Sequence, residues 1–180
     1  PDTFATVVVN DSASNTYTSY AEEAQESSFG LTVQSAILIA ENTGGLTGGG
    51  TITLTTTPSF GPEICAVAVS GVGATPVNTS SQGVTSSGNY SAGTINSGAS
   101  GAIIIAGHMT SGTPNSANPA AGFTKVGESL IFLQYSGEIA GNTDTDVSGT
   151  YGFGTRFSAN SAVALPLPAT GCTIVTVTDV

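Results

Sequence analysis

Basic residues are almost absent from this chain of 180 residues. Lys125 and Arg156 face twelve Asp and Glu side chains, so the formal net charge is −10. Binding to nucleic acid needs clustered Lys and Arg that neutralise phosphates, and we therefore expect no nucleic-acid partner. These fourteen charged side chains are spread over the roughly 8,000 Å² of surface that a folded monomer of this size exposes. We expect a surface made mostly of Thr, Ser, Asn and Gly, or one that neighbouring subunits partly cover.

Long apolar runs and export signals are missing as well. No stretch of eighteen apolar residues occurs, so we expect no membrane insertion. No basic segment precedes an apolar one, so no signal peptide is visible in the chain. Pro1 is compatible with a natural start after removal of Met, and equally with a processing site that would hide an export signal.

Groups that carry out catalysis are scarce. His108 is the one histidine and no Gly-x-Ser-x-Gly motif accompanies it, so we expect a structural role for it. Glu22, Glu23 and Glu26 lie close in sequence, and two such acids can flank a glycosidic bond. Sugar sites also use aromatic platforms, and Trp is absent, so we favour a solvated helical turn or loop over residues 21–28. The sequence therefore predicts no enzyme and no cofactor.

What the chain does contain is a series of short apolar or Thr-rich runs separated by Gly, Ser, Asn and Pro. This pattern predicts an all-β fold with negligible helix, an antiparallel β-sandwich or jelly roll of about ten or eleven strands. We expect one domain over residues 1–180, in which 166–180 is a Pro-led extension that ends in a strand. Strands are predicted at 4–9, 15–20, 29–41, 51–55, 64–71, 102–109, 123–126, 130–135, 157–165 and 172–178, with weaker ones near Val84, Tyr90 and Ile95.

Three of these segments carry more specific predictions. Residues 4–9 and 15–20 flank Asn10-Asp11-Ser12, a turn signature that predicts a β-hairpin between them. Residues 64–71 (ICAVAVSG) are predicted to be fully buried. Residues 102–109 (AIIIAGHM) form the most apolar segment and are expected to be the central strand.

The order of several motifs resembles a known type of domain. The motifs are VVVNDSASNTYTSY, AILIAENTGG, TITLTTT, AVSGV, AGFTKVGES and FSANSAVALPL. In this order they resemble the β-sandwich domains of bacteriophage virion proteins and of large secreted bacterial surface proteins. The resemblance covers roughly residues 5 to 166, and its motifs imply a fold and no catalytic residues.

Two departures from that pattern affect the ends of the chain. One or two apolar strands usually precede the Asp-Ser motif in such domains, whereas here the chain begins almost at it. At the other end the chain continues past Leu165 through Pro166 and Pro168 to a further strand. One strand is thus missing at the front and one is added at the back.

One segment has a weak calcium-site pattern. Oxygen-bearing side chains alternate as they do at the start of a calcium-binding loop, at Asn142, Asp144, Asp146 and Ser148. The position that requires Gly is Val147, and Phe153 stands where the loop needs Glu. We favour an acidic surface loop, with calcium binding as the alternative.

The two cysteines and the C-terminal tail, residues 166–180, are the segments with predicted roles in cross-linking or assembly. Cys65 is expected to be a buried small hydrophobe, and we favour thiols over a Cys65–Cys172 disulfide. The tail has the composition of an inserted strand, and its assembly residues are predicted to be Cys172, Ile174, Val175 and Val177. It can pair within its own domain or with a neighbouring subunit, and the Pro-containing linker slightly favours the neighbour.

These observations lead to a prediction of function in the structural class. We expect a component of a large assembly in the virion, a capsid decoration or cement protein that contacts identical subunits, the major capsid protein, or both. The first alternative is the subunit of a secreted bacterial or archaeal filament on the cell surface. The second alternative is a carbohydrate-binding module, which needs exposed aromatic side chains; the Tyr candidates are Tyr17, Tyr20, Tyr90, Tyr135 and Tyr151.

Overall fold

All regular structure in the described part of the chain is β-strand, as predicted. The computed structural model describes residues 6–26, 32–41, 50–57, 64–85, 88–111, 117–126, 131–151, 157–168 and 173–175. These residues form fourteen strands, more than the ten or eleven expected, because several strands are only two or three residues long. In this part of the chain no helix is long and apolar enough to cross a membrane.

A five-stranded antiparallel sheet forms the centre of the molecule. Its spatial order is β10-β11-β8-β13-β6. The strands are β6 (Asn78–Val84), β8 (Ala102–Thr110), β10 (Phe123–Val126), β11 (Ile131–Ser136) and β13 (Ser158–Pro166). The predicted central strand is therefore confirmed: β8 lies in the middle, with β11 on one side and β13 on the other.

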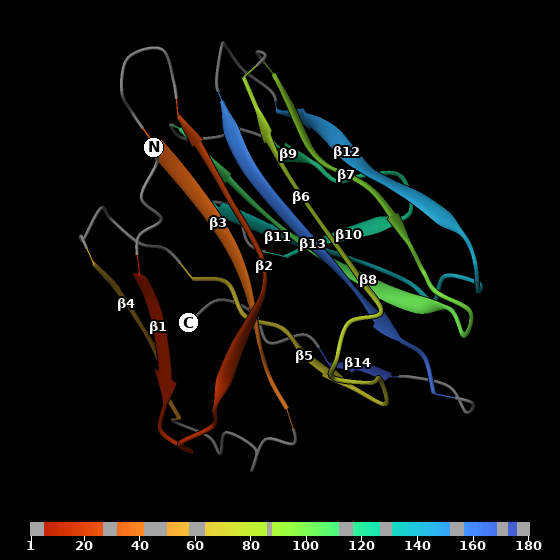
Figure 1. The fold of residues 1–180 in the computed structure, drawn as a ribbon, viewed down its shortest axis with the longest axis horizontal. Coiled ribbons are helices and arrows are strands. Elements are labelled where there is room, and N and C mark those ends of the chain that lie inside the picture. The colour runs from red at the N-terminus through yellow and green to blue at the C-terminus, as the bar shows by residue number, and fades with distance from the viewer. Residues whose placement is uncertain are drawn as a thin grey trace.

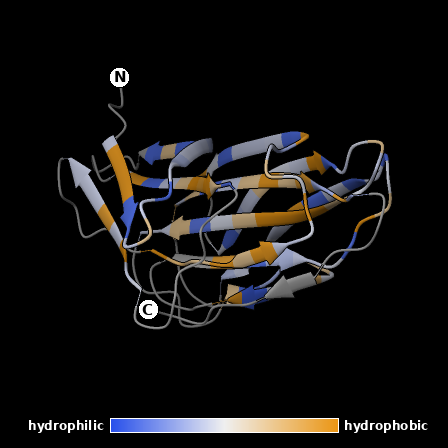
Figure 2. Cartoon of the chain, turned by 90° about the horizontal axis from the view of Figure 1, so that it is seen from below, coloured by the Kyte–Doolittle hydropathy of each residue, from blue (hydrophilic) through white to orange (hydrophobic). Residues whose placement is uncertain are grey.

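Both faces of this sheet are covered over β8 and β13. One face packs against a three-stranded sheet, in the order β7-β12-β9, of β7 (Asn89–Asn96), β12 (Asp144–Tyr151) and β9 (Ala117–Asn118). The other face packs against the pair β2 (Tyr17–Glu26) and β3 (Thr32–Ala40). Figure 2 shows the strands in stacked layers, with long hydrophobic stretches on the central ones. The sheets thus pack face to face as in a β-sandwich.

Small side chains allow β3 to approach the central sheet closely. The buried Ser35 hydroxyl donates to the carbonyl oxygen of Gly107 at 3.0 Å, and the Ser161 hydroxyl donates to the carbonyl oxygen of Ser35 at 3.2 Å. These two hydrogen bonds join β3 to β8 and β13, and they satisfy hydroxyl groups that have no contact with water.

The acidic segment 21–28 differs from its prediction. Residues 21–26 continue β2, and Ala21 to Glu26 pair with β3 in an antiparallel ladder. Ala21 is buried and Glu22 is exposed, which is the alternation of a strand over a core and not of a helical turn. Residues 27 and 28 lie outside the described residues.

The predicted hairpin between residues 4–9 and 15–20 is wrong. β1 (Thr6–Asp11) pairs with β4 (Ile52–Thr57), and β2 pairs with β3. The pair β1–β4 is one half of a long two-stranded ribbon, and the pair β2–β3 is the other half. The ribbon bends back on itself between the halves, so β1 and β2 run in opposite directions without a ladder between them (Figure 1). The fourth strand lies beside the first, which is one feature of a Greek key, but β1 and β2 lack the ladder that a Greek key has between them.

The segment 64–71 is buried on one side only, which corrects the prediction of full burial. Only β5 (Ala68–Ser70) is strand, and it pairs with β14 (Thr173–Val175). Cys65, Val67 and Val69 pack against the core, whereas Ile64 is 37% exposed. The segment lies at the rim of the core, where alternate residues face solvent.

Candidate functional site

His108 lies in a buried polar network that crosses the central sheet. It stands directly opposite Asn160 of the neighbouring strand β13, and its Nδ1 lies 2.9 Å from Asn160 Oδ1. On the other side Gln134 Nε2 lies 2.8 Å from His108 Nε2. All three side chains have no exposed surface. The network thus connects β11, β8 and β13 within the core.

The outer partners of the network determine where its protons lie. Asn160 Nδ2 donates to the carbonyl oxygen of Gln82 at 2.8 Å, so Asn160 Oδ1 accepts from His108 Nδ1–H. The Ala120 N–H donates to Gln134 Oε1 at 2.8 Å, so the Gln134 amide donates to His108 Nε2. The imidazole is therefore neutral, and both of its nitrogens have partners. Burial lowers the pKa of His108 to about 4, although the bond to Asn160 opposes this.

Two tyrosines close the network from the opposite sheet. The Tyr90 ring centroid lies 4.4 Å from that of His108 and 5.3 Å from that of Tyr151. The Tyr90 hydroxyl donates to the carbonyl oxygen of Asn118 at 2.5 Å. Burial raises the pKa of Tyr90 to about 12 and raises that of Tyr151 as well. A neutral His108 sealed between two layers is positioned to hold the sheets together, which supports the structural role expected for it.

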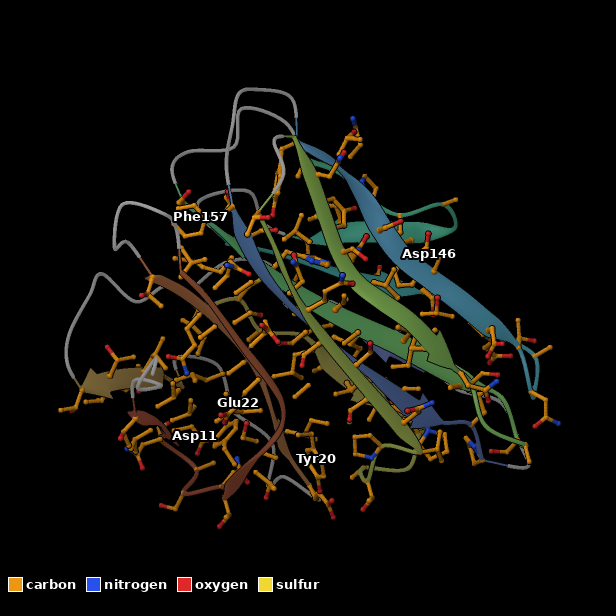
Figure 3. All side chains as sticks on the ribbon, turned by 45° about the horizontal axis from the view of Figure 1, so that its top comes forward. Asp11, Tyr20, Glu22, Asp146 and Phe157 are labelled. Carbon is orange, nitrogen blue, oxygen red and sulfur yellow. The ribbon has the colours of Figure 1, made fainter. Side chains whose placement is uncertain are left out.

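The paired carboxylates do not converge on a common site. Glu22 and Glu23 are consecutive residues of β2, so their side chains leave opposite faces of the strand. The Glu22 carboxylate accepts the Ser19 hydroxyl at 2.5 Å. Figure 3 shows Glu22 on the same side of the molecule as Asp11, and Asp146 on the opposite side. This arrangement gives no support to the glycosidase alternative; the side chain of Glu26 lies outside the described ones.

The calcium pattern falls on an extended strand. Asp144 begins β12, and Asp146 and Ser148 follow along it. Asp144 accepts the Asn96 side-chain amide at 2.7 Å, and Asp146 accepts the Ser148 hydroxyl at 2.6 Å. Asn142 precedes the strand in a left-handed conformation, with φ of 55°. Among the described residues no group of three or more His, Cys, Asp or Glu could hold a metal ion. Asp144, Asp146 and Ser148 therefore lie on a strand, which corrects the expectation of an acidic surface loop there.

The tail pairs within its own chain in this structure. Ile174 of β14 lies opposite Val69 of β5, and Val175 lies opposite Ala68. Cys172 and Val177 lie outside the described residues, so the assembly role of the four tail residues stays a prediction. Cys65 is present as a thiol, with its Sγ 3.7 Å from the carbonyl oxygen of Val126.

The five tyrosines do not form an exposed row. Tyr90 and Tyr151 are buried, and Tyr135 packs partly against the core. The hydroxyl of Tyr20 donates to the Glu41 carboxylate at 3.2 Å, and that of Tyr17 donates to Asp11 at 2.7 Å. The tyrosines therefore supply no platform for a carbohydrate-binding module.

Asp11 organises the corner where the ribbon doubles back. Its carboxylate accepts the backbone N–H groups of Ala13 and Asn15, the side-chain amide of Asn15 and the hydroxyl of Tyr17, at 2.7 to 3.0 Å. The bond from Tyr17 contributes most to lowering the pKa of Asp11 to about 2. Ser14 adopts a left-handed conformation, with φ of 59°. The Asp-Ser motif therefore forms a turn, as its residues predict. The turn is a corner of the ribbon and not the end of a hairpin between β1 and β2.

Beyond this corner the β1–β4 ribbon has no buried side chain. Val8 is 45% exposed, and Thr53, Thr55 and Thr57 are exposed beside it. On the other face Val7, Val9, Ile52 and Leu54 are only half-buried and belong to none of the buried core clusters. Sequence reasoning recognised the alternation of β4 but missed its partner strand, and hence this surface.

Comparisons with protein-family models, with curated proteins and with solved structures found no match for this chain.

Proposed function

We propose that this chain is a non-enzymatic structural protein of a large assembly, a bacteriophage virion component of the capsid decoration or cement type. The observation that carries the proposal is the incompletely covered β1–β4 ribbon, in which Asp11 is the one charged side chain, on a protein of net charge −10. A two-stranded ribbon is only marginally stable alone in water, so this element gains stability when a neighbouring subunit covers it.

Further observations support an assembly role. The polar groups of the core, His108 above all, are engaged in joining strands. The resemblance of the motifs to virion β-sandwich domains adds the specific setting.

Imaging the native assembly at a resolution that traces chains tests this function. We expect to find the chain as an outer subunit on a capsid lattice, in contact with identical subunits, the major capsid protein, or both. A helical array of this chain on a cell surface would instead support the filament alternative, which the same ribbon would serve. Isolated monomers in the native source would contradict both.

Self-association of this chain should strengthen with salt. Two copies that each carry a net charge of −10 repel one another, and raising ionic strength from about 0.1 M to about 1 M shortens the screening length from roughly 10 Å to roughly 3 Å. Sedimentation velocity across this range should show a shift toward larger species. Dissociation on adding salt would show that charge pairs hold the assembly, against the proposal. A chelator distinguishes this screening from binding of divalent ions.

A further inference from the structure

The β4 edge is the outermost strand edge of the ribbon. β1 occupies one side of β4, in a ladder that runs from Thr6 opposite Thr57 to Asp11 opposite Ile52. The structure pairs no other described strand with β4, whose remaining side faces outward (Figure 1). In an edge strand every second residue directs its N–H and C=O away from the existing partner, so this side presents an open row of hydrogen-bonding groups.

This edge lacks the features by which proteins usually block strand pairing. Pro, charged side chains and β-bulges are the common protections, and β4 (ITLTTT) has no Pro and no charge. The β1–β4 ladder has no register shift, whereas shifts interrupt the β2–β3 and β7–β12 ladders. The edge strand β10 carries Lys125. An uncharged edge without Pro or a bulge, composed mostly of β-branched residues, is well suited to accept another strand.

The distribution of charge indicates what the partner is. β4 contains no formal charge, and Asp11 at the end of β1 is the one formal charge in the two strands, so thirteen of the fourteen charged side chains lie outside the ribbon. A cationic partner would be attracted to the acidic regions and not to this ribbon. A second copy can approach here with the fewest like charges in contact. An antiparallel edge is also self-complementary about a twofold axis, as an isologous contact requires.

We propose that the β4 edge pairs with β4 of a second copy of this chain, in an antiparallel contact about a twofold axis. The contact joins two marginal ribbons into a four-stranded sheet with β4 at its centre. This inference rests on the proposed structural function and names the surface and the partner through which the assembly grows.

Charge placed on the β4 edge tests the contact. Thr55→Glu and Thr55→Lys should each weaken self-association by about tenfold or more, because a twofold contact brings the two added like charges close together across the paired edges. Thr79 is an exposed threonine of β6, so Thr79→Glu and Thr79→Lys make the same changes in net charge away from the ribbon. Dissociation constants for all five proteins come from sedimentation equilibrium in about 0.5 M salt, where long-range repulsion is screened. Circular dichroism verifies that each variant is folded.

A measurement on the unmodified protein avoids dependence on variant folding. Backbone amides of residues 52–57 should exchange more slowly as the protein concentration rises, while those of β6 should not change. Unchanged exchange in β4 where association is measured, or equal effects at positions 55 and 79, would overturn the β4 contact and leave the proposed function standing. A protein that stays monomeric at every concentration and salt would contradict both.

Discussion

Asn160→Ala should cost about 3 kcal/mol or more of the free energy of unfolding. The substitution leaves the buried His108 Nδ1–H and the part-buried carbonyl oxygen of Gln82 without the partner that Asn160 provides. Each buried group left unpaired costs about 1–3 kcal/mol. Urea and thermal unfolding at neutral pH measure the loss, and for a chain of this size the melting temperature should fall by roughly 10 °C.

Asn89→Ala provides the matched control. Asn89 is an exposed asparagine of β7, so its replacement should change the free energy of unfolding by no more than about 0.5 kcal/mol. If Asn160→Ala were as harmless as Asn89→Ala, the buried network would contribute nothing to the stability of the sandwich, and the structural role of His108 would be wrong.

Acid should destabilise the protein through the same histidine. The pKa of His108 is about 4 in the folded protein and 6.5 in its ordinary state, so the unfolded chain binds more protons between these values. The stabilisation is therefore fully present above pH 6.5 and is lost as the pH falls to about 4, with a total of about 3 kcal/mol. The variant His108→Gln should show a shallower fall in stability over this interval. Equal slopes in the two proteins would contradict a buried neutral imidazole.

Deleting residues 170–180 should leave a poorly soluble or unassembled protein. β14 is the ladder partner of β5, and its removal exposes the edge of β5 beside Val67 and Val69, which pack against the core. The soluble fraction on expression and light scattering of the purified chain measure the effect. A truncated chain that stays folded and still assembles would show that the tail is only a surface strand.

Hydrogen exchange distinguishes pairing within one chain from pairing between chains. In this structure β14 lies against β5 of the same chain, so protection of Ala68–Ser70 should not depend on protein concentration. Protection that appears only in assembled protein would instead support insertion of the tail into a neighbouring subunit, the alternative that the Pro-containing linker slightly favours.

The strands that the sequence identified best are those whose environment follows from local composition. The apolar run in β8 predicts a strand buried on both faces, and the alternation in β4 predicts an exposed row of threonines. β13 is just as buried as β8, although Ser158, Asn160 and Ser161 make it much more polar. Its burial depends on partners from β8, β3 and β6, and no local pattern reports such partners.

The candidate surface could not be predicted for a related reason. The Asn-Asp-Ser turn chemistry is the same whether the two flanking strands pair with each other or with different partners. The choice depends on Thr53 and Leu54, more than forty residues along the chain, which pair with Asn10 and Val9. A contact between such distant residues leaves no trace in a single sequence. The exposed edge that follows from it was therefore invisible before the strands were placed.

The pairing of β8 with β13 also determines when this protein can fold during synthesis. Ile105 lies opposite Val163, and Ala102 lies opposite Pro166, so the central ladder joins residues about sixty positions apart. A ribosome adds about 5–20 residues per second, so β8 waits several seconds for its partner. During that time its AIIIA segment has no strand on that side and is accessible to chaperones that bind apolar segments. The sandwich can be completed only after β13 has left the ribosome.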